Sequence, residues 1–216
     1  MRLTVFGATG LVGKNVFKHA LAQAHHVTAF GRNVESLVDA DLSNDHLVAI
    51  KGSVFDAENV YNAVKESDAV ISVIGGGVDG VDKTRSLGMK TIITQMERAG
   101  IKRIVALGGL GILDAPDGGF LVDKPGYPQQ FLAVGREHLQ AYLYLKDSGL
   151  DWTMVGAPNI IDEGNTVRYI TAIDQPTSPN AGKINAGNLA LFMVSEVVTN
   201  QYIKHRVGIS NAPEIQ

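Results

Sequence analysis

Three glycines, each separated by two residues, follow directly on a short apolar run near the start of the chain. The run is Leu3–Phe6, the glycine motif is Gly7–Gly13, and the stretch from Lys14 to Ala24 has helical composition. Glycine adopts backbone angles that side chains forbid, so the main chain here can pass close to a pyrophosphate. The first amides of the helix that follows, with its dipole, attract such an anion. A G-x-x-G-x-x-G motif between strand and helix therefore predicts a dinucleotide site.

The three glycines have different expected roles. Gly7 makes the turn, Gly10 lets the chain approach the ligand, and Gly13 lets the helix pack closely on the strand. The other cofactor contacts predicted in this segment are Thr9, Leu11 and Val12. The alternative interpretation is a glycine turn with a purely structural role, because the spacing differs from the commoner G-x-G-x-x-G.

Short apolar runs alternate with segments of helical spacing along the chain. The runs are Leu3–Phe6, Val27–Phe30, Leu47–Ile50, Ala69–Ile74, Arg103–Leu107 and Trp152–Val155, with a closing strand near Arg206–Ile209. Runs that are apolar throughout indicate strands covered on both faces. Helices are predicted over 84–99, 129–148 and 186–199, and residues 174–182 have the composition of a loop. This pattern predicts an α/β fold, a doubly wound parallel sheet with helices on both faces.

Length and composition narrow the classes of function. The 216 residues suit one domain, 1–216, and leave too little chain for a separate substrate domain. A net charge of −3 without a basic stripe argues against nucleic acid or an anionic membrane as the main partner. The apolar runs are too short to span a bilayer, and Met1-Arg2 leads straight into a strand, so we expect a cytoplasmic protein.

The chain has no cysteine. It therefore offers neither a thiolate nucleophile nor a thiolate metal site, and any redox chemistry would belong to a bound cofactor. The six histidines have no recognisable partner residues in the sequence with which they could bind a metal ion, so no metal site is predicted.

The end of the second predicted strand bears on the choice of cofactor. An NAD site usually places a carboxylate there for the adenosine ribose, whereas an NADP site places a cation for the 2′-phosphate. The sequence has Arg32 at this point and no carboxylate. Arg32 therefore favours NADP(H) over NAD(H), the alternative being a solvated loop arginine.

Glycines and small residues also follow the next predicted strands. Ser53 and Val54 are expected beside the adenine, and Gly75 and Gly76 beside the cofactor's ribose, since open α/β sheets bind ligands at the carboxyl ends of their strands. A flexible loop over 75–77 is an equally weighted alternative. Gly108, at the end of the fifth strand, continues the same predicted groove.

Together these segments resemble one family over almost the whole chain. They are GATGLVG at 7–13, Arg32, GSVFD at 52–56, AVISVIGGG at 69–77, MERAGIKRIVALGG at 96–109, SGLDWTMVGAPNI at 148–160 and INAGNLALFMV at 184–194. The chain resembles the atypical short-chain dehydrogenase/reductases, in particular the small NAD(P)H-binding proteins similar to biliverdin reductase B (flavin reductase) and the NmrA-like proteins. The resemblance implies a single Rossmann-type domain in which residues from about 158 on form a small extension on the acceptor side.

The sequence also departs from this family. Dehydrogenase members carry a serine near position 108 or 109, and they also carry a Y-x-x-x-K pair. In this chain positions 108 and 109 are both glycine. Tyr142 and Lys146 have the right spacing, yet they lie too close to the turn at Ser148 and are interpreted as a helix-surface pair. Ser53 replaces an aspartate that many relatives have beside the adenine.

The resemblance implies further residues around the nicotinamide. His138 aligns with a histidine of the biliverdin reductase B-like proteins, and an imidazole that titrates near neutrality could donate to an acceptor; an ordinary helix histidine is the alternative. Pro158 and Ile160 are expected beside the carboxamide. Residues 127–131 and the loop 111–126 are expected to cover the acceptor, as a mobile lid. Phe120 and Phe131 are candidates to stack on it or to anchor the loop.

Two functions follow from this resemblance. The first is an NADPH-dependent oxidoreductase that transfers hydride to a planar acceptor, a flavin, quinone or tetrapyrrole, without a Ser-Tyr-Lys set. The alternative is an NmrA-like protein that senses NADP(H) without turnover. The identity of the acceptor and the oligomeric state stay open.

Overall fold

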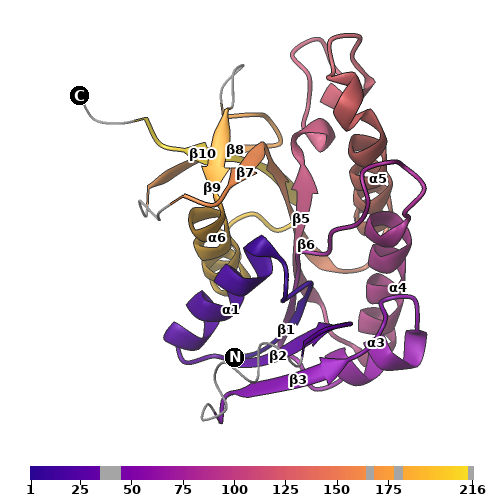
Figure 1. Cartoon of the computed structure of the whole chain (residues 1–216), viewed down its shortest axis with the longest axis vertical. Coiled ribbons are helices and arrows are strands. Elements are labelled where there is room, and N and C mark those ends of the chain that lie inside the picture. Colours follow the sequence, from indigo (N-terminus) through magenta and orange to yellow (C-terminus); the bar gives the residue numbers. More distant parts are fainter. Residues whose placement is uncertain (35–44, 164–167, 178–181, 214–216) are drawn as a thin grey trace.

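A mostly parallel sheet runs through the middle of the molecule (Figure 1). The computed structural model describes residues 1–34, 45–163, 168–177 and 182–213. Within these ranges, eight strands have the order β3-β2-β1-β4-β5-β6-β10-β8. They are β1 Arg2–Phe6, β2 His26–Gly31, β3 Leu47–Lys51, β4 Ala69–Ser72, β5 Arg103–Gly109, β6 Asp151–Ala157, β8 Tyr169–Ile173 and β10 His205–Asn211. All neighbours are parallel except β8, which is antiparallel to β10.

Helices cover both faces of this sheet (Figure 1). On one face, α1 (Leu11–Ala22) packs against α6 (Ala186–Thr199), and their apolar side chains form one core cluster with the sheet. On the other face, α3 (Ala57–Val64), α4 (Thr84–Ala99) and α5 (Gln129–Lys146) form a second cluster. Short 3₁₀ turns, η1 (Leu110–Ile112) and η2 (Leu121–Asp123), lie between β5 and α5. The predicted doubly wound α/β sheet is confirmed.

Local signals explain where several elements begin and end. The Asp56 carboxylate accepts a hydrogen bond from the Asn59 amide, which caps the start of α3. Gly100, with φ of 75°, ends α4 in the left-handed conformation that suits glycine. Along β4 every side chain is buried, as expected for a strand covered on both faces.

The part of the chain after Pro158 contains strands that the sequence did not predict. A second sheet pairs β7 (Asn159–Ile161) in parallel with β9 (Lys183–Asn185), and β8 closes one edge of the main sheet. The predicted loop 174–182 has neither helix nor strand in its described part, 174–177 and 182; residues 178–181 lie outside the described residues.

A buried ion pair joins the sheet to α6. The Arg103 guanidinium lies 2.7 Å from the Glu196 carboxylate, and both side chains are less than a tenth exposed. Thr153 on β6 donates to the same carboxylate, and so do the backbone amides of Gln201 and Tyr202. This network connects β5, β6 and α6 at the end of the sheet opposite the carboxyl ends of β1 and β4.

Candidate functional site

Two of the three motif glycines are required by the fold itself. Gly7 has φ of +83°, and a Cβ there would lie 2.6 Å from the Val73 carbonyl oxygen. A Cβ at Gly13 would lie only 2.1 Å from the Gly7 carbonyl oxygen, because helix and turn are in close contact. Gly10 differs, since its nearest neighbour would be 3.4 Å away and its φ of −73° suits any residue. Packing within the chain therefore does not explain why position 10 is a glycine.

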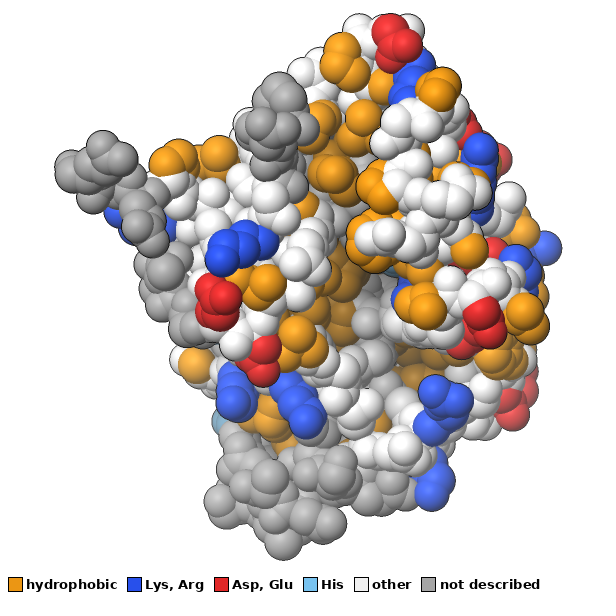
Figure 2. Space-filling view, turned by 45° about the horizontal axis from the view of Figure 1, so that its top comes forward, with side chains coloured by type: hydrophobic (Ala, Val, Ile, Leu, Met, Phe, Trp, Pro, Cys, Tyr) orange, Lys and Arg blue, Asp and Glu red, His pale blue; other side chains and the backbone are white. Residues whose placement is uncertain are grey.

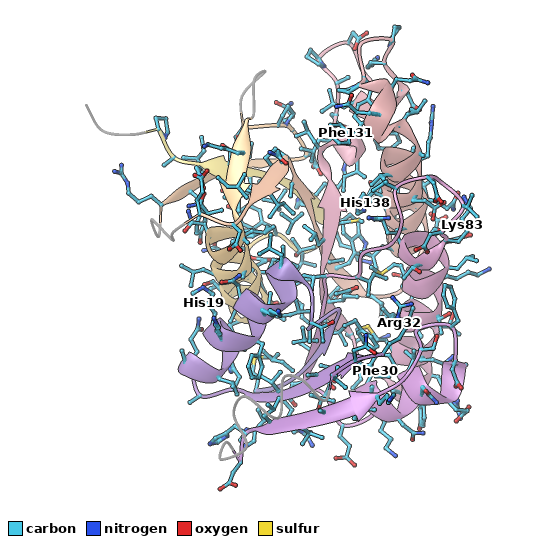
Figure 3. The ribbon with its side chains drawn as sticks, viewed as in Figure 1. His19, Phe30, Arg32, Lys83, Phe131 and His138 are labelled. Atoms are coloured by element: carbon cyan, nitrogen blue, oxygen red, sulfur yellow. The ribbon has the colours of Figure 1, made fainter. Side chains whose placement is uncertain are left out.

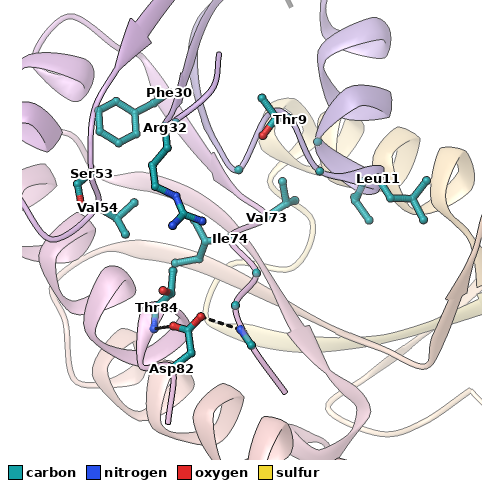
Figure 4. Close-up of a pocket in the computed structure, with 18 of the residues that line it drawn as sticks. Thr9, Leu11, Phe30, Arg32, Ser53, Val54, Val73, Ile74, Asp82 and Thr84 are labelled. Carbon is teal, nitrogen blue, oxygen red and sulfur yellow. Dashed lines mark hydrogen bonds between the residues drawn. The ribbon is translucent and has the colours of Figure 1, made fainter. Parts of the chain in front are cut away.

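A cavity of about 530 Å³ opens where β1, β2, β3 and β4 end (Figure 4). The predicted cofactor residues that line it are Gly7, Thr9, Gly10, Leu11, Val12, Gly13, Arg32, Ser53, Val54, Gly75, Gly76 and Ile160. Predicted residues from five separate stretches of sequence thus meet around one space. Their binding roles stay a prediction.

Arg32 is an exposed cation at the rim of this cavity, and Figure 4 shows its side chain extending into it. No described residue forms a hydrogen bond or ion pair with it. Ser53 lies across from it and accepts a hydrogen bond from the Phe55 amide at 3.2 Å. Within the described ranges, the guanidinium therefore has all its donors available to a ligand.

Asp82 and Arg85, which the sequence interpretation missed, hold the glycine segment 75–77 in place. The Asp82 carboxylate accepts hydrogen bonds from the amides of Gly77 (2.7 Å) and Thr84 (2.8 Å), as Figure 4 shows. Hydrogen bonds from Thr84 and from the Gly77 amide lower the pKa of Asp82 to about 2. Arg85 donates to the carbonyls of Gly77 (2.8 Å) and Gly76 (2.9 Å). Hydrogen bonds from Asp82 and Arg85 thus fix both the amide and the carbonyl groups of this segment. The sequence signal that could have predicted the contact is an aspartate two residues before Thr84, because such side chains often bind nearby backbone amides.

A second cavity, of about 480 Å³, continues from the first. Both are lined by Val73, Ile74, Gly75 and Ile160. The space-filling view shows a long hollow with hydrophobic side chains along it (Figure 2). The predicted residues Gly108, His138 and Pro158 line the second cavity, together with Tyr127, Pro128 and the half-exposed Phe131. Of the predicted cover, residues 111–126 do not line either cavity.

His138 is a residue of α5, and its ring lies beside Gly109 at the end of β5 (Figure 3). A Cβ on Gly109 would be 3.1 Å from its ring. Burial, and then the nearby Arg85 charge, lower the pKa of His138 to about 3. The expectation that this imidazole titrates near neutrality is therefore wrong. A neutral ring instead offers one N–H donor and one acceptor nitrogen.

Tyr142 and Lys146 do not form a helix-surface pair, which corrects the sequence interpretation. Tyr142 is buried, with its ring in edge contact with Phe120 and Trp152, and the Arg206 guanidinium lies 5.1 Å from its ring centroid. Lys146 is exposed, and neither residue lines a cavity. Phe120 is partly buried and packs against this core, whereas Phe131 lines the second cavity.

Within the described ranges, no helix is both long and apolar enough to cross a membrane. No group of three or more potential metal-ligating side chains lies close enough together there to hold an ion.

Comparisons with known proteins agree with this geometry. Residues 7–200 match the NAD(P)H-binding family. YwnB, an uncharacterized protein of Bacillus subtilis strain 168, is 24% identical over 165 residues, which cover 75% of this chain and 74% of YwnB. A Bacteroides thetaiotaomicron structure, provisionally named an epimerase, is 25% identical with a TM-score of 0.86 and covers 100% of this chain and 99% of its own.

A further solved structure bears on the chemistry. It is a Streptococcus pneumoniae TIGR4 protein, provisionally named an NADH-flavin reductase, which is 25% identical with a TM-score of 0.82. The match covers 98% of this chain and 100% of that one. These findings confirm the resemblance to the atypical short-chain dehydrogenase/reductases and NmrA-like proteins. The chain belongs to the NAD(P)H-binding family.

Proposed function

We propose that this protein is an NADPH-dependent reductase that transfers hydride to a planar acceptor such as a flavin or quinone. The observation that carries the proposal is the junction of two cavities at Val73, Ile74, Gly75 and Ile160. One cavity contains the dinucleotide motif, and the other is predominantly apolar. The similarity to the pneumococcal protein supports a flavin as the acceptor.

The residues of the first cavity fit a nicotinamide nucleotide. Gly10 leaves main chain open where the fold does not require a glycine, as a close pyrophosphate contact needs. Arg32, which has no partner among the described residues, would bind the 2′-phosphate that distinguishes NADP from NAD. Ser53 and Val54 would flank the adenine, while Gly75, Gly76, Gly108, Pro158 and Ile160 would lie along the ribose and nicotinamide.

When bound, NADPH supplies the hydride. The chain's own part is to align the two rings and exclude water, for which the aliphatic side chains of Val73, Leu107 and Ile160 are suited. His138, neutral at physiological pH, would orient an acceptor carbonyl through its N–H, and the proton would come from solvent. Pro158 and Gly182 line the second cavity, which supports a role of the chain after residue 158 on the acceptor side.

The test is oxidation of NADPH and of NADH, followed by absorbance, with FMN, riboflavin and a quinone as acceptors. We expect Arg32→Ala to raise the KM for NADPH about tenfold or more and to change that for NADH less than about twofold, since it removes charge-assisted hydrogen bonds to phosphate. Arg2→Ala, an exposed arginine at the opposite end of β1, is the matched control. Equal effects on both nucleotides would contradict the assignment of Arg32.

A nucleotide sensor of the NmrA-like kind is the second candidate. It is favoured by the absence of a hydroxyl at Gly108 and Gly109 and by the burial of Tyr142 in the core. Tight NADPH binding without consumption by any acceptor would decide for the sensor.

A further inference from the structure

Among the described residues that line the second cavity, only Arg85 has a charged side chain. The remaining lining is apolar, apart from Tyr127, His138, Asn159 and the main chain. We propose that the acceptor carries an anionic group and that Arg85 selects it. This inference rests on the proposed function, because it concerns the acceptor of that reaction.

The Arg85 guanidinium is fixed in position but has donors to spare. Its two terminal nitrogens donate to the Gly76 and Gly77 carbonyls, at 2.9 and 2.8 Å, which uses two of five N–H groups. The contacts are to neutral carbonyl oxygens and do not neutralise the charge. An anion that enters the cavity would therefore meet an already oriented cation, which reduces the entropy lost on binding.

The neighbouring carboxylates are engaged elsewhere. Asp82 lines the first cavity and accepts from the Gly77 and Thr84 amides. Glu137 is buried, where it pairs with Lys83 at 2.8 Å and accepts from Ser86 at 2.6 Å. Among the described residues no carboxylate lies within ion-pair distance of Arg85. The cation is thus left for a ligand.

The surroundings of Arg85 strengthen its electrostatic interaction with a bound anion. The lining is largely aliphatic and aromatic, so an ion pair inside the cavity would be screened less than one on the fully exposed surface. Burial lowers the pKa of Arg85 from its usual value, and Asp82 and Glu137 oppose that effect. The Arg85 charge in turn contributes to lowering the pKa of His138, which lines the same cavity. A neutral planar molecule would leave this charge without a partner, whereas an anionic one would not.

The experiment compares three flavins with the same ring system. Riboflavin is neutral, FMN carries a phosphate, and N10-carboxymethylflavin carries a carboxylate. Their affinities for the protein saturated with NADP⁺ are measured by flavin fluorescence, with no hydride available. We expect FMN to bind about tenfold more tightly than riboflavin, and Arg85→Gln to abolish the difference by weakening FMN alone. If carboxymethylflavin also binds more tightly than riboflavin, the selection extends to carboxylates. If only FMN binds more tightly than riboflavin, the selection is restricted to phosphates.

Two controls separate charge from architecture. Arg85→Lys keeps the positive charge but loses the forked donor geometry of the guanidinium, and we expect it to retain part of the preference for FMN over riboflavin. Arg136→Gln removes an exposed arginine of α5 that pairs with Asp123 and lines neither cavity, so it should leave all three affinities unchanged. In the wild type, the preference for FMN should decrease as salt is raised, which tests the inference even if a variant does not fold.

Equal binding of riboflavin and FMN to the wild type would overturn the inference. So would an equal loss of all three flavins in Arg85→Gln, since Arg85 would then act only through the glycine segment. Turnover with NADPH is measured separately. If no flavin is reduced but FMN binding depends on Arg85, the proposed reductase activity is contradicted and the anion site is supported. If flavins are reduced and neither binding nor reduction depends on Arg85, the reductase activity is supported and the anion site is contradicted.

Discussion

Gly7 and Gly10 lie three residues apart in one motif, but the fold constrains these two positions differently. Gly7 has a positive φ and no room for a Cβ beside the Val73 carbonyl, whereas Gly10 has an ordinary φ and a tolerable neighbour. We expect Gly7→Ala to destabilise the protein by roughly 3 kcal/mol. Gly10→Ala should leave stability within about 1 kcal/mol but weaken NADPH binding about tenfold or more.

Urea unfolding and fluorescence titration with NADPH measure the two effects. The pair of variants is its own control, because the same methyl group is added at both sites. A Gly10→Ala protein that binds NADPH normally would remove Gly10 from the cofactor site.

His138 gives a prediction for stability against pH. Its pKa is about 3 in the folded protein against an ordinary value of 6.5, so the unfolded chain takes up the proton first as the pH falls. The stability that this neutral ring contributes is present above pH 6.5 and is lost progressively between 6.5 and 3. The melting temperature of His138→Gln should therefore fall less steeply than that of the wild type from pH 7 to 4.5. Parallel curves for the two proteins would contradict the low pKa. Burial also lowers the pKa of His25, but that histidine is present in both.

At the scale of elements, one contact joins β5 and β6 to α6. Replacing Arg103 by Met would leave the buried Glu196 carboxylate without its cation, at a cost of about 3–5 kcal/mol. Loss of the exposed Arg2–Asp68 pair in Arg2→Ala should cost at most about 1 kcal/mol. Chemical denaturation of both variants provides the comparison, and similar small losses would mean that the network around Glu196 relaxes around the missing charge.

The order of strands and helices could be predicted because apolar runs and glycine stops are local signals. The same signals located the motif, Arg32 and the strand-end glycines around one cleft. Strands β7, β8 and β9 have only three to five residues and mixed polarity, so no periodicity marked them. Tyr142 could have been assigned to the core, since it shares a helix face with Leu139 and Leu145. The contacts of Arg85 with Gly76 and Gly77 depend on a loop conformation that no local pattern encodes.

At the scale of the whole molecule, Gly75 lies where the two cavities meet. A Cβ at this position would contact nothing within 4 Å, so the fold tolerates a side chain there. Because both ligands would approach each other at this point, we expect Gly75→Leu to lower kcat/KM for the acceptor roughly tenfold or more, and Gly75→Ala to have a smaller effect. Stopped-flow measurement of NADPH oxidation tests the series, with melting temperatures as the control for folding. Unchanged rates in Gly75→Leu would place the transfer elsewhere.

The helices that follow β1 and β4 leave these two neighbouring strands toward opposite faces of the sheet, α1 to one side and α4 to the other. No helix can therefore close the space above the strand ends, and a crevice at this topological switch point is a result of chain direction. It carries none of the penalty of a void inside a packed core, because no core side chains were removed to make it. Substitutions at its rim can thus change which molecules enter while the packing of both layers below stays as it is.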